Sequence, residues 1–498
     1  ENIVAALKSL AREADDAVIA TDYDREGELI GKEAYELIEE ETDIPIKRVR
    51  FSSITEREVR DAFANPDDLD FDLAAAGEAR QIIDLMWGAA LTRFLSLTAG
   101  QLGNDFISVG RVQSPTLKLI VDREREIQAF DPDDYWEIFG DLTKDDEAFE
   151  AQYFYEGEDG TENERVWNGT DADAAYEDLR EATSASVESV RRRTRTDDPP
   201  APFNTTQFIR AAGSLGYSAQ RAMSIAEELY TAGWITYPRT DNTVYPEDLD
   251  PEELLATFAD TGAFGEDAAS LLEQEDIEPT EGDEETTDHP PIHPTGEIPG
   301  RQDLSEDEWE VFELVVRRFL ATCAEPATWA HLRVVATANG RSLKANGKRL
   351  VEAGYHAVYP YSSASENFVP EVEEGDDLAL ADVRIEEKET QPPRRRGQSR
   401  LIETMESMGI GTKCITADTQ ILTRTDDGDI ERRRVSDLFE SRRTVIADGD
   451  TDIATTDGPA TVSYDEPTGR TDEVTADLIS RRDLDADEQV PSLETDAK

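Results

Sequence analysis

The sequence contains very little cysteine and histidine. Among 498 residues there are two cysteines and four histidines. Cys323 and Cys414 lie far apart, so they form no disulfide framework, and their scarcity is typical of a reducing cytosol. The sequence also lacks an apolar run long enough to cross a membrane, and no signal peptide opens it. We therefore expect a cytoplasmic protein without a membrane partner.

Positive charge is scarce as well. Lys and Arg number 50 against 112 Asp and Glu, which gives a formal net charge of −62. Carboxylates spread along a whole chain are typical of a halophilic protein, because they keep the surface hydrated in a salty cytoplasm. An acidic protein that avoids nucleic acid is the alternative. At molar salt, however, the Debye length is about 3 Å, so a local basic cleft can still bind an anion.

The chain is long enough for several domains with a sizeable core. It begins at Glu1 rather than at Met, already inside a helix-like pattern. We therefore expect a fragment of a longer protein.

Acidic residues follow a short buried strand near the start of the chain. The strand covers residues 17–20, and residues 21–28 (TDYDREGE) lead into a helix. In α/β folds, sites lie at the carboxyl ends of strands. The carboxylates are Asp22, Asp24 and Glu26. Three carboxylates at one turn suit Mg²⁺, which prefers oxygen ligands, and Arg25 could contact phosphate. The alternative is a solvated helix start, where the helix dipole favours acids.

A Tyr and an Arg lie two positions apart in residues 233–241 (GWITYPRTD). In an extended segment, Tyr237 and Arg239 fall on the same side, and Pro238 stiffens the chain between them. A phenol beside a guanidinium can attack a phosphate, because the Arg holds phosphate oxygens and favours the ionised phenol. The alternative is a packed aromatic beside a surface charge. A helix capped by Ser218 is expected to deliver this segment.

Two further segments carry polar groups suited to phosphate. Residues 110–117 (GRVQSPTL) combine Arg, Gln and hydroxyls at an expected helix start, which suits sugar and phosphate contact. Helix capping by Ser114, with Pro115 at the first position, is the alternative. Residues 289–295 (HPPIHPT) hold two histidines, which can donate a hydrogen bond or a proton to phosphate. A proline-stiffened loop is the alternative there, and the lack of Cys partners argues against zinc.

The hydrophobic patterns predict an order of helical and strand-rich regions. Residues 61–127 and 203–324 are expected to be helical, whereas 128–200 and 331–385 alternate as strands do. Strands that stop, give way to helices and then resume indicate one domain inserted into another.

Together these motifs resemble those of the type IA DNA topoisomerases. Residues 21–28 are similar to the acidic signature of the Toprim domain, and residues 235–241 resemble the active-site signature of the family. Further similar segments, in the family's order, are residues 79–84 (ARQIID), 110–114 (GRVQS), 288–295 (DHPPIHPT), 401–406 (LIETME) and 409–413 (GIGTK). The resemblance covers residues 1–413.

The resemblance implies a role for each matching residue. Tyr237 would attack single-stranded DNA and keep the 5′-phosphate covalently, Arg239 would hold the scissile phosphate, and His289 would contact it. Asp22, Asp24 and Glu26 would bind Mg²⁺, with Glu26 also catalytic. The residues implied to bind DNA are Arg25, Arg80, Arg111, Gln113, Ser114 and Asp241.

The implied activity is ATP-independent breakage, passage and rejoining of one DNA strand, which relaxes negative supercoils. The implied protein is an archaeal, DNA-associated monomer whose partner is single-stranded or negatively supercoiled DNA. The implied fold is multidomain α/β plus α+β: a Toprim α/β domain, helical domains and a β-rich gate arch form a toroid, and a β-rich Hint-like intein segment follows. The expected domains are residues 1–62 (partial Toprim), 63–127 and 386–413 (helical DNA-binding), 128–203 and 325–385 (gate arch), 204–324 (helical, with Tyr237) and 414–498 (intein start).

The sequence departs from the family pattern in three places. The first Toprim motif, with a catalytic Glu and a Lys, is expected before Glu1, and no carboxyl-terminal zinc region is present. After Lys413 the expected Ala-Thr-Arg is replaced by residues 414–423 (CITADTQILT), which resemble the start of an intein.

The intein hypothesis assigns Cys414 as the splicing nucleophile, attacking the Lys413 carbonyl, since a thiol suits that acyl shift. No His occurs in residues 415–498, so we expect a truncated or split intein, with a complementary intein half as candidate partner. A halophilic acidic tail with a chance Cys is the alternative. For the chain as a whole, the alternatives are a non-catalytic DNA-binding fragment, a Toprim nuclease or primase, and a split-intein carrier.

Overall fold

The computed structural model describes residues 2–101, 106–157, 160–247, 249–286 and 289–410, together with the backbone of seven strands between residues 420 and 482. These strands are β10 (Gln420–Arg424), β11 (Ile430–Arg434), β12 (Arg443–Asp448), β13 (Thr451–Thr455), β14 (Ala460–Asp465), β15 (Arg470–Thr475) and β16 (Leu478–Arg482). They form two antiparallel sheets. The intein hypothesis stays a prediction, because Cys414 lies outside the described residues.

The amino-terminal unit is a small α/β layer. Its elements are α1 (Asn2–Ala11), β1 (Ala17–Ile19), α2 (Arg25–Glu39), β2 (Ile46–Arg48) and α3 (Glu56–Ala64). β1 and β2 pair in parallel, with Ala17 opposite Ile46. Parallel strands need a crossover between them, and α2 supplies it. The acidic segment is therefore the β1–α2 turn, at the carboxyl end of a strand, as the sequence predicts.

Three helices form the next layer: α4 (Phe71–Thr98), α5 (Gln113–Ala129) and α12 (Gln398–Ser407). Gly77 lets α4 lie against α2, since a Cβ there would stand 2.5 Å from the Arg25 carbonyl oxygen. Ser114 does not cap α5, because Val112 occupies the N-cap position and makes no side-chain cap. The capping alternative for Ser114 is therefore wrong.

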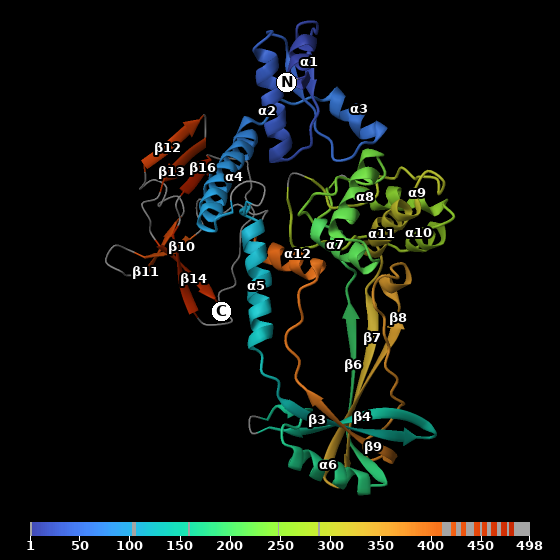
Figure 1. Cartoon of the computed structure of the whole chain (residues 1–498). Coiled ribbons are helices and arrows are strands. Elements are labelled where there is room, and N and C mark those ends of the chain that lie inside the picture. The colour runs from blue at the N-terminus through green and yellow to red at the C-terminus, as the bar shows by residue number, and fades with distance from the viewer. Residues whose placement is uncertain are drawn as a thin grey trace.

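A seven-stranded antiparallel sheet, here called the arch sheet, lies at the far end of the molecule (Figure 1). Its order is β3-β9-β6-β7-β8-β4-β5. The strands are β3 (Asp134–Lys144), β4 (Glu147–Glu156), β5 (Glu162–Asn163), β6 (Ser184–Asp197), β7 (Ala327–Ala338), β8 (Arg341–Glu352) and β9 (Asp377–Glu389). Helix α6 (Gly169–Glu181) packs on the sheet, and Leu179, Ile138 and Leu378 are fully buried between them. The sequence patterns do not predict α6.

A helical domain, here called the head, is inserted between β6 and β7. Its helices are α7 (Thr205–Ser214), α8 (Ala219–Thr231), α9 (Pro251–Ala259), α10 (Gly265–Leu271) and α11 (Glu306–Thr322). Ser218 caps α8 by accepting from the Arg221 amide, as predicted, and Ser305 with Glu308 forms a capping box on α11. Phe208, Phe258 and Phe312 are fully buried in its core.

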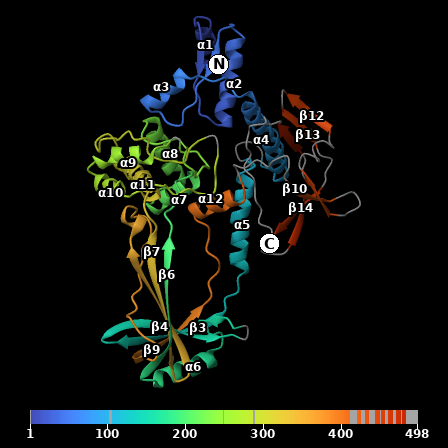
Figure 2. The ribbon, with the colours of Figure 1, turned by 180° about the vertical axis from the view of Figure 1, so that it is seen from behind.

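The arrangement places the head between the amino-terminal unit and the arch sheet (Figures 1 and 2). Strands β6, β7 and β8 run from the arch sheet up to the head. The arch sheet has a second connection, to the layer of α4, α5 and α12: helix α5 leads down to the sheet, and the chain after β9 leads back up to α12. β6 and β7 pair along their length although the head separates them in sequence, so the predicted insertion of helices between strands is confirmed.

Candidate active site

Tyr237 lies where the head meets the amino-terminal unit. Its amide donates to the Ser52 carbonyl at 3.0 Å, and its side chain is 7% exposed. Gly233 begins the segment with φ +81°, and a Cβ there would lie 2.5 Å from the Ile54 carbonyl oxygen. Only Gly fits both the backbone angle and this approach. The segment therefore lies against the amino-terminal unit at Gly233 and at Tyr237.

Two rings enclose the phenol. The His289 ring is tilted against it with centroids 4.3 Å apart, and Tyr230 of α8 packs edge-on at 5.2 Å. The Tyr230 hydroxyl donates to Asp22 at 3.5 Å, which connects the head to the acidic turn. His289 is buried, and its carbonyl accepts from Thr240 and from Asn242. The structure thus brings together the Tyr, His and acidic motifs that the sequence separates.

Burial sets the protonation of Tyr237. Removal from water raises its pKa, the charges of Asp22 and Asp24 raise it further, and Arg239 lowers it. The Arg239 side chain is 59% exposed and pairs with Glu227 of α8. Arg239 is therefore paired with Glu227 rather than with the phenol in this state, although its charge still lowers the pKa of Tyr237, and the prediction that the two residues share one side stays a prediction. The segment forms only an isolated bridge, Ile235 to Pro294, so strand alternation does not apply.

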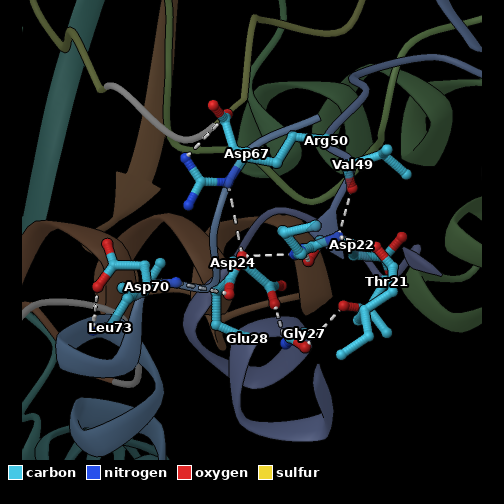
Figure 3. Close-up of polar contacts among 12 residues, drawn as sticks. Thr21, Asp22, Asp24, Gly27, Glu28, Val49, Arg50, Asp67, Asp70 and Leu73 are labelled. Carbon is cyan, nitrogen blue, oxygen red and sulfur yellow. Dashed lines mark hydrogen bonds and ion pairs between the residues drawn. The ribbon is translucent and has the colours of Figure 1, made fainter. Parts of the chain in front are cut away.

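The acidic turn is held in shape by hydrogen bonds between its side chains and its own backbone (Figure 3). Asp24 caps α2 by accepting from the Gly27 amide at 2.7 Å, and Thr21 donates to the Gly27 carbonyl at 2.8 Å. A Cβ on Gly27 would stand 2.0 Å from the Asp22 carbonyl oxygen, so the turn requires glycine. Burial, followed by the charge of Asp24, raises the pKa of Asp22.

A fully buried ion pair lies beneath this turn. Arg48 of β2 donates to Glu28 at 2.8 Å, and its other end donates to the Asp22 carbonyl at 2.9 Å. Glu28 also accepts from the Asp70 amide at the start of α4. Sequence reasoning missed Arg48, Glu28 and Tyr230. An Arg in a short strand and a fourth acid in an acidic turn give no signal of burial without the fold.

The expected convergence of three carboxylates is not seen. Among the described residues, no group of three or more His, Cys, Asp or Glu is placed to hold a metal ion. The Glu26 side chain turns instead to Arg80 and Arg25. Asp22 and Asp24 do fit a cation, because the charge of Asp24 disfavours ionisation of Asp22 and Mg²⁺ accepts two carboxylates with waters.

Basic residues implied to contact DNA lie beside the acidic turn. Arg80 pairs with Glu26, and Arg111 pairs with Asp84 at 2.8 Å. Burial, and then the charges of Arg111 and Arg25, lower the pKa of Arg80. Three other residues are implied to bind DNA. Gln113 and Ser114 follow Arg111 at the start of α5, and Asp241 comes four residues after Tyr237.

Comparison with known families agrees with this geometry. A family model described as DNA topoisomerase matches residues 68–439, and a model of the Toprim domain matches residues 1–54. The chain belongs to the type IA DNA topoisomerases. The topoisomerase match continues past Cys414, where we expected the intein to begin. Among the described residues, no helix is both long and apolar enough to cross a membrane.

Individual relatives support the assignment to the topoisomerases. The chain is 47% identical over 412 residues to DNA topoisomerase 1 of Archaeoglobus fulgidus, covering 82% of this chain and 59% of that protein. It is 40% identical over 407 residues to DNA topoisomerase 1 of Thermoplasma acidophilum, covering 82% and 51%. The chain thus spans little more than half the length of these relatives.

A solved structure shares the fold. Full-length topoisomerase I from Thermotoga maritima matches with a TM-score of 0.66 and 28% identity, covering 83% of this chain and 66% of that one. The Toprim unit, the helical layers and the large antiparallel sheet are therefore those of a toroidal topoisomerase.

Proposed function

We propose that this chain carries the strand-cleaving part of an ATP-independent topoisomerase that relaxes negatively supercoiled DNA. The observation that carries the proposal is the enclosure of Tyr237 by His289, Tyr230 and the Asp22–Asp24 turn. The Tyr237 oxygen would attack a DNA phosphorus, forming a Tyr–phosphate bond as the bond to the 3′ oxygen breaks. The phenol proton leaves and the 3′ oxygen gains one. The reverse step reseals the strand, and no ATP is needed because the bond energy is kept.

The side chains around the phenol have distinct roles in this proposal. His289 is in contact with the Tyr237 ring and is placed to donate to a phosphate that enters there. Arg239 would leave Glu227 and hold phosphate oxygens, since a guanidinium binds phosphate in bidentate fashion. Asp22 and Asp24 would hold Mg²⁺, which neutralises charge on phosphate oxygens when bound.

DNA must displace the amino-terminal unit to reach Tyr237. The residue Tyr237 is 7% exposed, and the Tyr237–Ser52 and Tyr230–Asp22 contacts both cross the boundary between the head and the amino-terminal unit. A DNA phosphate that entered this closed site would not lower the raised pKa of Tyr237, because its charge disfavours the phenolate. The pKa would fall only if cations or water entered with the phosphate. We therefore propose that the structure is a closed, DNA-free state of the enzyme.

Covalent capture tests the proposal. Single-stranded DNA labelled at its 3′ end is mixed with the chain and Mg²⁺ in KCl, quenched in detergent and run on a gel. Label should stay with the wild type and be lost in Tyr237→Phe. Tyr245→Phe is the matched control, since Tyr245 is a buried tyrosine of the same core. A second arm adds the family's first Toprim motif as an amino-terminal extension. Loss of label in both arms, with DNA still bound, would favour the non-catalytic binding fragment.

The intein hypothesis is kept as a second proposal on the strength of residues 414–423. Cys414 would attack the preceding carbonyl and transfer the acyl group to sulfur. The chain alone should give no spliced product, because residues 415–498 contain no His to assist. Hydroxylamine, which cleaves thioesters, should release residues 1–413 from the wild type but not from Cys414→Ala. An uncleaved wild type would contradict the hypothesis.

A further inference from the structure

One strand of the arch carries charge opposite to that of the chain. β6 holds four arginines within five positions, in a protein with 112 acidic and 50 basic residues. They are Arg191, Arg192, Arg193 and Arg195, and all are exposed. Side chains alternate along a strand, so Arg191, Arg193 and Arg195 share one face, here called the arginine stripe.

The neighbouring strands add to the positive charge of this face. Arg191 lies opposite Arg333 of β7, and Arg193 lies opposite His331. His331 in turn lies opposite Lys348 of β8. Like charges directly opposite each other destabilise a sheet. Arg191 and Arg333 are such a pair, and Glu162, which pairs with Arg333, offsets part of that cost.

The stripe has no carboxylate partner. Within the described residues, none of Arg191, Arg193 and Arg195 makes an ion pair or a side-chain hydrogen bond. The basic residues around it behave differently. Arg333 pairs with Glu162, and Arg192, on the other face, donates to the Val372 carbonyl at 2.8 Å. The stripe arginines therefore keep their charge unpaired in a chain whose carboxylates outnumber its basic residues.

Protection of a sheet edge does not explain the stripe. β6 pairs with β9 only over residues 184–186, so its upper part is an edge, and charged side chains do guard edges against aggregation. Glu or Asp would guard the edge equally well, and this chain uses them on the rest of its surface. Asp197 follows on the same face but accepts from the Tyr355 hydroxyl, so three arginines without a carboxylate partner point to an anion outside the chain.

We propose that the arginine stripe binds the sugar-phosphate backbone of DNA at a second site, apart from the residues around Tyr237. Because DNA is chosen as the anion, the inference rests on the proposed function. Alternate residues of a strand are about 6.6 Å apart, similar to the spacing of successive phosphates along one DNA strand. The stripe would contact phosphates without reading sequence, and His331 and Lys348 would widen the contact.

The experiment compares the triple variant Arg191→Gln, Arg193→Gln, Arg195→Gln with a control of equal charge change. The control replaces Arg57, Arg60 and Arg180 by Gln, three exposed arginines in surface ion pairs. Dissociation constants are measured against KCl for a single-stranded oligonucleotide and for a duplex of the same length. Each lost phosphate contact should reduce the log–log salt slope by about 0.7–0.9, so the stripe variant should lose roughly 2.

The control should keep the wild-type slope, and so should the triple variant Arg191→Lys, Arg193→Lys, Arg195→Lys, which retains the charges. Loss for the duplex alone would assign the stripe to double-stranded DNA, and loss for both would assign it to either form. Two outcomes would overturn the inference. The stripe variant could keep the wild-type salt slope, or the stripe and control variants could lose the same amount of slope. Thermal unfolding of each variant confirms that it is folded.

Covalent capture separates this inference from the proposed function. The stripe variant should still capture a short oligonucleotide through Tyr237, because no stripe residue touches that site. Capture with unchanged salt slopes would overturn the stripe alone. A slope change without capture by any variant would overturn the proposed chemistry and leave the stripe standing.

Discussion

At the scale of single residues, Asp22 is held in a state that disfavours its charge. Burial and Asp24 raise its pKa in the folded chain. A raised pKa contributes stability below the unfolded value of about 3.9, and this contribution is lost as pH rises through the folded pKa. Asp22→Asn should therefore raise the free energy of unfolding at pH 7, without Mg²⁺, and have little effect near pH 4.

Asp68→Asn is the control for Asp22→Asn. The hydrogen bond from Lys47 lowers the pKa of Asp68, so its contribution has the opposite sign and is lost as pH falls. Mg²⁺ should raise the unfolding temperature of the wild type and have less effect on Asp22→Asn. Equal unfolding curves for Asp22→Asn and wild type at pH 7 would show that the turn does not strain this carboxylate.

Glu227 gives a second residue-scale prediction. Glu227 forms an ion pair with the guanidinium of Arg239, the group that we propose to hold DNA phosphate. An exposed pair contributes about 0.2–1 kcal/mol, so Glu227→Gln should tighten single-strand binding by a factor of about 1.4 to 5 at low salt. The gain should vanish at 1 M KCl, where the pair is screened. Glu228→Gln, which removes the same charge one residue along α8, should show less than half the gain in titrations of the same oligonucleotide.

At the scale of elements, the buried pair of Arg48 and Glu28 joins β2 to α2 and to the acidic turn. Replacing one partner leaves the other charge buried and unpaired, which costs about 3–5 kcal/mol. Arg48→Met and Glu28→Gln should each lose that much stability in urea unfolding. The double variant should recover part of it, because no charge then remains buried. Additive losses in the double variant would mean that the two side chains act independently.

Much of this architecture could be predicted from local patterns, and the exceptions have physical causes. The β1–α2 turn and the helix capped by Ser218 follow from buried strands, caps and glycines, which act within a few residues. Tyr237 and its implied role were visible as a motif. Its burial against Ser52, and the turning of Glu26 away to Arg80, depend on packing between segments distant in sequence. The amphipathic helix α6 was not predicted, because the sequence on either side of it alternates as strands do.

At the scale of the whole molecule, the net charge of −62 opposes folding. The Debye length falls from about 10 Å at 0.1 M salt to about 3 Å at 1 M, so added salt screens repulsion between surface carboxylates. The unfolding temperature should therefore rise steeply between 0.1 and 1 M KCl and level off above that. A rise that stays linear to 3 M would indicate salting-out instead. The same salt weakens phosphate contacts, so DNA binding should fall over the range in which the fold gains stability. Differential scanning fluorimetry and DNA titration in one KCl series would measure both trends. Together they define the range of KCl in which the chain is folded and still binds DNA.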